Sequence, residues 1–246
     1  MLTIANCLAG GHGSVIMPEG KSHQDSKLHA LRTGAARAAL VAAAIANERG
    51  NPPPVIQPTG LHWRTHYWFR TGCFVEYPKP IKINLVFDKA ESTRLASGEW
   101  IEPSSSAVHD LKDQMFNAIS PLTPDSPNWE TFRALKLIAN LKAINNQQPF
   151  TTLREEVLST RNIRANNKDN SNLEKILPEA IEAAEILHSH NLDCSSIGAN
   201  HNLKKLNLKS RIKAIIGLLL MTFTLIPSIL GSGIQSILAR YMAEKS

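Results

Sequence analysis

Residues 214–239 read AIIGLLLMTFTLIPSILGSGIQSILA and contain no charged side chain. An uncharged apolar stretch of about 18 or more residues is typical of a membrane-spanning helix. A basic flank on such a stretch prefers the cytosolic side of a bilayer and can contact anionic lipid headgroups. We therefore predict a C-terminal transmembrane helix, with the preceding bulk of the chain in the cytosol. The cations predicted to contact the headgroups of an anionic leaflet are Lys204, Lys205, Lys209, Arg211 and Lys213.

The same stretch contains helix-breaking residues, which leave two other interpretations open. Pro227 stands in its middle, and Gly231 and Gly233 follow. In one alternative, residues 212–226 form a buried core helix, and a second, amphipathic helix follows the glycine turn. In the other, both pieces enter the membrane as a shallow helical hairpin. The side chains predicted to contact hydrocarbon in the membrane versions are Leu218, Leu219, Leu220, Met221, Phe223, Leu225 and Ile226.

The composition is that of an ordinary globular chain with a basic surface. The chain has 246 residues, of which 43% are hydrophobic, and its formal net charge is +6. This length allows a sizeable core in one large or two small domains. The positive charge suits an anionic partner such as phospholipid or nucleic acid.

The cysteines and histidines argue against a disulfide framework and against a metal site. Cys7, Cys73 and Cys194 are far apart and odd in number, and no CxxC pair occurs. His62 and His66 lie four residues apart on a predicted strand, which places them about 13 Å from each other. We therefore expect reducing surroundings, no metal and no cofactor.

The residue patterns predict an α+β fold that is mainly helical. Residues 61–71 alternate with a period of two, and residues 73–77 and 81–87 supply further short strands. A small antiparallel sheet is therefore predicted near residues 61–88. The glycine-rich residues 1–20 are predicted as a short strand or extended arm followed by a loop. The C-terminal stretch completes the fold as an apolar helix or helical hairpin.

Helices are predicted over most of the remaining chain. Alanine-rich residues 24–48 favour a helix, and apolar residues recur at helical spacing from residue 108 onwards. Thr152 with Glu155, and Ser171 with Glu174, match the capping box. We predict three parts: an α+β domain over residues 1–165, a helix with a polar linker over 171–205, and an apolar membrane-associated segment over 212–243.

The sharpest enzymatic hypothesis is a cysteine nucleophile. Cys7 precedes His62 and His66, and Asn84 and Asp88 come later on or near another predicted strand. This chain order, cysteine then histidine then asparagine or aspartate, resembles that of the papain-like cysteine peptidases. The resemblance implies that the thiolate of Cys7 attacks the substrate with a histidine as its base. No peptidase signature surrounds Cys7, and the predicted helix starts well after it.

A third hypothesis is nucleic-acid binding by residues 61–71. Arg64 and Arg70 accompany Trp63, Tyr67 and Trp68, and such a surface can stack bases and hold phosphates. The alternative is an aromatic core face opposite a solvated basic face.

The chain also resembles, in texture, effector proteins secreted by intracellular bacteria of the Legionella and Coxiella kind. The resemblance rests on four asparagines (Asn145, Asn146, Asn166 and Asn167), on capped helices, on the apolar tail and on a short charged end. It implies secretion into a host cell and action at host membranes, and it transfers no functional residue. Our leading hypothesis is a membrane-anchored interaction or adaptor protein. The alternative is a cysteine-dependent hydrolase or transferase that uses Cys7 with His62 or His66.

Overall fold

The computed structural model describes residues 1–64, 71–165, 171–204 and 208–228, and then residues 232, 233, 235, 237, 240 and 241. The side chains of residues 171, 172, 209, 210 and 226–228 lie outside this description. The chain divides into two compact units, Met1–His201 and Asn202–Ser246. The described residues are mainly helical, with two small antiparallel two-stranded sheets, which confirms the coarse fold class.

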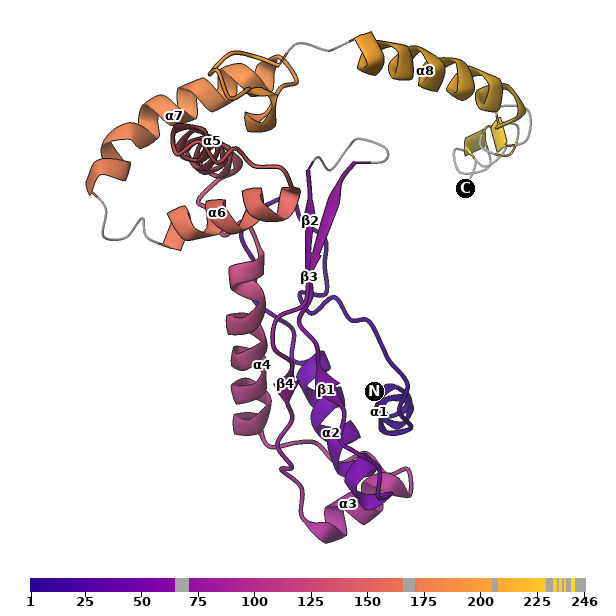
Figure 1. Ribbon diagram of the computed structural model, residues 1–246. Helices are drawn as coiled ribbons and strands as arrows, with labels where there is room; N and C mark the ends of the chain where they lie inside the picture. Colours follow the sequence, from indigo (N-terminus) through magenta and orange to yellow (C-terminus); the bar gives the residue numbers. More distant parts are fainter. Residues whose placement is uncertain are drawn as a thin grey trace. The chain divides into compact units, whose positions relative to one another are not determined.

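The helix α2 (Gly34–Glu48) forms the centre of one part of the first unit. Three helices pack against it: α1 (Leu2–Ala9), α3 (Lys89–Ala96) and α4 (Ser105–Ile119) (Figure 1). Residues 38–46 are all buried, and most of them are alanines. Such small side chains let neighbouring helices approach closely. The predicted alanine-rich helix is confirmed, although it begins ten residues later than expected.

The prediction of a strand or extended arm at the N-terminus is wrong. Residues 2–9 form α1, whose Ala5 and Ala9 are buried against α2 together with Ala42 and Ile45. The glycines that suggested an extended arm come after this helix, and Gly11, with φ of +85°, turns the chain away from it.

A second helical group surrounds α5 (Trp129–Asn145), which follows α4 and the short 3₁₀ turn η1 (Ser120–Leu122). It packs against α6 (Leu153–Ala165), α7 (Ser171–Ser189) and the 3₁₀ turn η3 (Cys194–Ser196) (Figure 1). The capping box of α6 is confirmed. The Glu155 amide donates to Thr152 Oγ1, and the Thr152 amide donates to Glu155 Oε2, both at 3.2 Å. The Ser171 side chain of the second predicted box lies outside the described residues.

The strands form one hairpin that is interrupted once. Strand β2 (Gly60–Trp63) pairs with β3 (Cys73–Glu76), and β1 (Val55–Ile56) pairs with β4 (Ile81–Lys82). Three residues, 57–59, separate β1 from β2, whereas four residues, 77–80, separate β3 from β4, so the register slips by one. Prolines 58, 78 and 80 lie in this gap, where they cannot donate to a ladder. The single predicted sheet is therefore two short sheets, and positions 65–70 of the predicted strand lie outside the described residues.

The second unit contains α8 (Leu208–Ser228). The prediction of a transmembrane helix is wrong: among the described residues, no helix is long and apolar enough to cross a membrane. The charge-free part of α8, residues 214–228, extends about 22 Å at 1.5 Å per residue. That length falls short of a hydrocarbon core of about 30 Å.

The close packing of α1 on α2 predicts that a larger side chain at Ala42 is destabilising. Ala42→Leu should lower the free energy of unfolding by about 1–3 kcal/mol, because a buried alanine has no room for three more carbons. Asn47→Leu, on the exposed end of the same helix, is the matched control and should change stability little. Urea unfolding measures both, and equal midpoints for the two variants would contradict this packing.

Candidate functional site

The predicted catalytic residues are distributed over separate elements. Cys7 lies exposed on α1, and among the described residues no histidine ring lies within hydrogen-bonding reach of its sulfur. His62 lies on β2 and contacts Glu76 instead. Asn84 is exposed after β4, and Asp88 caps α3 by accepting the Glu91 amide at 2.8 Å. The other predicted base, at position 66, lies outside the described residues.

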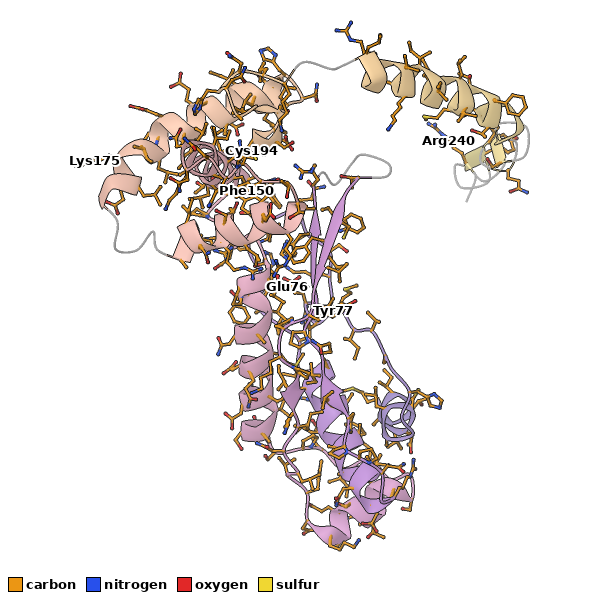
Figure 2. All side chains as sticks on the ribbon, viewed as in Figure 1. Glu76, Tyr77, Phe150, Lys175, Cys194 and Arg240 are labelled. Atoms are coloured by element: carbon orange, nitrogen blue, oxygen red, sulfur yellow. The ribbon has the colours of Figure 1, made fainter. Side chains whose placement is uncertain are left out.

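His62 belongs to a network that ties the hairpin to α6. Its Nε2 atom lies 3.2 Å from Glu76 Oε2, and Arg161 donates two hydrogen bonds to the same carboxylate, at 2.8 and 2.7 Å. Glu76 is labelled in Figure 2. Burial lowers the pKa of His62, and Glu76 partly offsets this by raising it. The hydrogen bond from Arg161 lowers the pKa of Glu76. These contacts give His62 a role in holding β2 and β3 against α6.

A buried carboxylate, Glu156 on α6, forms the most unusual cluster of the first unit. Its side chain is only 3% exposed. Lys136 Nζ on α5 lies 2.7 Å from Glu156 Oε1, and Arg64 Nη1 at the end of β2 lies 3.0 Å from Oε2. The Cys194 thiol of η3 donates to Glu156 Oε1 across 3.8 Å. We name this group, Arg64, Lys136, Glu156 and Cys194, the Glu156 cluster.

The protonation states within the Glu156 cluster follow from burial and charge. Burial raises the pKa of Cys194 to about 12, so the group is a neutral thiol at physiological pH. Burial also acts to lower the pKa of Lys136, but neighbouring Cys194, Glu156 and Asp193 outweigh it and raise that pKa. Asn140 donates to the Cys194 carbonyl at 2.8 Å and fixes η3 beside α5. Cys194 is labelled in Figure 2. Cys194 is thus held in place but is not activated as a nucleophile.

A pocket of about 460 Å³ opens beside this cluster. Its walls come from β2, from α5, from the end of α7 and from the segment that continues into η3. Three aromatic side chains line it, namely Trp63, Trp129 and Phe132. Three cationic side chains also line it, namely Arg64, Arg133 and Lys136. Among the described carboxylates, Asp193 alone reaches the lining, while Glu156 does not.

A histidine pair near the N-terminus has the composition of a metal site but not the geometry. The ligand atoms of His23, Asp25 and His29 lie within 4.8 Å of one another. The two imidazole rings are stacked, however, with centroids 3.9 Å apart and planes inclined by 6°. A ligated ion lies close to the plane of each histidine ring, and two stacked parallel rings share no such point. Glu19 and Asp25 instead accept from one ring each, at 2.9 and 2.7 Å.

The apolar side chains of α8 are exposed to solvent. The predicted hydrocarbon contacts that the structure describes are 53–79% exposed, and residue 226 lies outside the description. Thr222 and Thr224 direct their hydroxyls to backbone carbonyls of their own helix at 2.8 and 3.1 Å. Among the predicted headgroup contacts, the side chains at positions 205 and 209 lie outside the description, whereas Arg211 and Lys213 are exposed. The described part of α8 therefore begins with exposed basic residues and continues as an exposed apolar surface.

Comparison with known protein families, with curated proteins and with solved structures finds no match to this chain. The resemblance to bacterial effectors and to cysteine peptidases accordingly stays a prediction. The nucleic-acid hypothesis also stays a prediction, with the added observation that Arg64 faces Glu156 and Asp193.

Sequence reasoning missed the Glu156 cluster. Its members lie at positions 64, 136, 156 and 194, with no common motif or spacing. One signal was available: the capping box fixes where α6 begins, so Glu156 falls in its first turn. The capping box does not show which side of α6 packs against α5, so the burial of Glu156 could not be predicted from it.

The buried ion pair predicts a strong coupling between Lys136 and Glu156. Lys136→Met should cost about 3–5 kcal/mol of unfolding free energy, because it leaves a buried carboxylate short of one partner. Adding Glu156→Gln to this variant should recover much of that loss, since the buried charge is then gone. Chemical denaturation of the wild type, the two single variants and the double variant completes the cycle. Additive losses would show that the pair is not coupled.

The thiols should differ in their reactivity towards iodoacetamide. In the native protein at pH 8, Cys194 should be alkylated far more slowly than Cys7 or Cys73, because it is buried and stays protonated. Unfolding in guanidinium should remove the difference, and peptide mass spectrometry measures each site. Rapid native labelling at Cys194 would refute this assignment. A rate at Cys7 far above that at Cys73 would instead favour the cysteine-enzyme hypothesis.

Proposed function

We propose that this chain is a peripheral membrane-binding interaction protein whose helix α8 inserts into one leaflet of an anionic bilayer. The observation that carries the proposal is the exposure of the large apolar side chains of α8 next to basic residues. In this proposal, residues 1–201 form the part that meets other molecules at the membrane surface.

The apolar surface of α8 requires a cover. Leu218, Leu219 and Leu220 are consecutive, so they project about 100° apart around the helix, and each is more than 60% exposed. Removing apolar surface from water contributes about 25 cal/mol per Å². The hydroxyls of Thr222 and Thr224 are already satisfied by the helix backbone, which lowers the cost of placing them in hydrocarbon. A lipid acyl region can cover all sides of such a helix.

The length of α8 supports insertion into a single leaflet. Its charge-free part of about 22 Å is longer than half of a hydrocarbon core, about 15 Å, and shorter than the whole. An oblique helix of this length buries its apolar part without reaching the other surface. Its N-terminal end then stays at the level of the headgroups.

The basic residues match the charge of an anionic surface at that end of the helix. Arg211 and Lys213 are exposed in the first part of α8, and Lys204 precedes the helix. Each lysine or arginine near an anionic leaflet contributes about 1 kcal/mol to binding. This complementarity favours anionic lipid over an apolar protein surface as the partner of α8.

Vesicle binding tests the proposal. The full chain should co-sediment with vesicles of phosphatidylserine and phosphatidylcholine, and about 30-fold more weakly after Arg211→Gln with Lys213→Gln, which removes about 2 kcal/mol of attraction. Leu219→Asp with Phe223→Asp should abolish binding, because each carboxylate inside hydrocarbon costs about 2.5 kcal/mol or more.

The matched control is Val15→Asp, which places a carboxylate on an 88%-exposed apolar residue of the first unit and should leave binding unchanged. Hydrogen exchange without vesicles provides a second readout. If α8 is already protected there, or if the carboxylate variants bind like wild type, the apolar surface has another cover and the proposal fails.

A further inference from the structure

We propose that the pocket beside the Glu156 cluster binds a small molecule that combines an aromatic ring with an anionic group. Every lining residue belongs to the unit Met1–His201, so this inference is independent of the membrane proposal. The volume of about 460 Å³ lies within the range of about 300–1,000 Å³ that small-molecule sites occupy.

The aromatic walls of the pocket are held in position without a ligand. Trp129 Nε1 donates to the Gln24 carbonyl at 2.6 Å, and the Trp129 and Phe132 rings meet edge to face at 5.8 Å between centroids. Trp63 on β2 remains 45% exposed although it lines the pocket. A planar ring placed against Trp63 would cover this surface, and offset stacking between aromatic rings is favourable.

The charged groups of the lining favour an anion. Arg64, Arg133 and Lys136 belong to the lining of the pocket, whereas three carboxylates that pair with them, Glu130, Glu156 and Glu185, do not. Glu156 faces Arg64 and Lys136 from α6, and Glu185 accepts from Arg133 Nε at 2.7 Å from α7. Asp193, which is part of the lining, partly offsets these cations and lies 3.9 Å from Arg64 Nη1. The described part of the lining therefore carries three cations against one carboxylate.

Arg64 supplies a second reason for an anionic group. Its Nη1 atom is inaccessible to solvent, and although Glu156 lies 3.0 Å away, the N–H groups are not directed at that oxygen well enough for a hydrogen bond. A buried donor without a well-placed acceptor is costly. Because a solvent-inaccessible atom does not face the open pocket, an anionic ligand oxygen would meet it only after the Arg64 side chain, which is 30% exposed and lines the pocket, turns towards the ligand.

The burial of charge at this wall is better explained by binding than by stability. A buried ion pair is often no more stabilising than apolar residues of the same volume, because desolvation offsets the attraction. Perturbed ionisable groups beside a pocket are typical of ligand sites. The buried thiol of Cys194 stays protonated and is a poor nucleophile, so the proposed binding includes no covalent bond to it.

Three small probes test separately the aromatic ring and the anionic group of the proposed ligand. The probes are 2-naphthoate, which has a ring and a charge, 2-naphthamide, which has the ring alone, and acetate, which has the charge alone. In ¹⁵N-labelled full-length protein, 2-naphthoate should shift the indole N–H signals of Trp63 and Trp129 but not that of Trp100, which packs near α1 to α3. 2-Naphthamide should bind about tenfold more weakly, and acetate should cause no shift at millimolar concentration.

Two variants test whether the residues that we place in the pocket walls bind the probe. The indole signals are first assigned by replacing each tryptophan with phenylalanine. Arg133→Gln should weaken 2-naphthoate binding about tenfold. Arg94→Gln, which removes an arginine of α3 from its ion pair with Glu99, should not. Trp63→Ala should also weaken it about tenfold through lost stacking. An affinity unchanged by both pocket variants, or equal affinities for 2-naphthoate and 2-naphthamide, would overturn the proposal. So would shifts confined to residues of α8.

Discussion

A buried carboxylate connects three of the segments that meet around α5. Glu156 lies on α6 and forms ion pairs with Lys136 on α5 and with Arg64 at the end of β2. The Cys194 thiol adds a contact from the turn after α7. Because an unpaired charge at this depth is costly, these contacts favour the arrangement in which the four segments meet. The ion pairs therefore act together with the apolar cluster of Leu137, Ala184 and Cys194 in setting the positions of the pocket walls.

The parts of the fold that could be predicted are those in which neighbours along the chain determine the structure. The alanine-rich helix, the helices after residue 108 and the capping box at Thr152 and Glu155 follow from local propensity and local hydrogen bonds. The N-terminal helix was missed because its helical character depends on burying Ala5 and Ala9 against α2, a contact more than thirty residues away. The apolar stretch was judged by its lack of charge over residues 214–239, whereas α8 ends at Ser228.

The candidate sites divide in the same way. The exposed apolar residues of α8 and the basic residues before them could be named from composition alone, because they are contiguous. The pocket could not be predicted in this way, because it combines side chains from β2, α5 and η3. The sequence also does not show that Arg64 lines the pocket whereas Glu156 does not. Asp88, predicted as a catalytic partner, is a helix cap, a role that its position before Glu91 indicates in retrospect.

The interrupted hairpin links the two helical groups of the first unit. Its base, with Ile56, Ile81 and Ile83, belongs to the apolar core beside α2 and α4, whereas its other end carries the Glu76 contact to α6 and the Arg64 contact to Glu156. The one-residue slip, where Gln57 donates to the Pro78 carbonyl at 2.7 Å, separates the strand pair in the first surroundings from the strand pair in the second. Because both groups contact the same ribbon, we expect the loosening of one group to remove contacts that steady the strands beside the other. Thermodynamic linkage through this ribbon would make a molecule that binds at one end of the unit raise the melting temperature of the other.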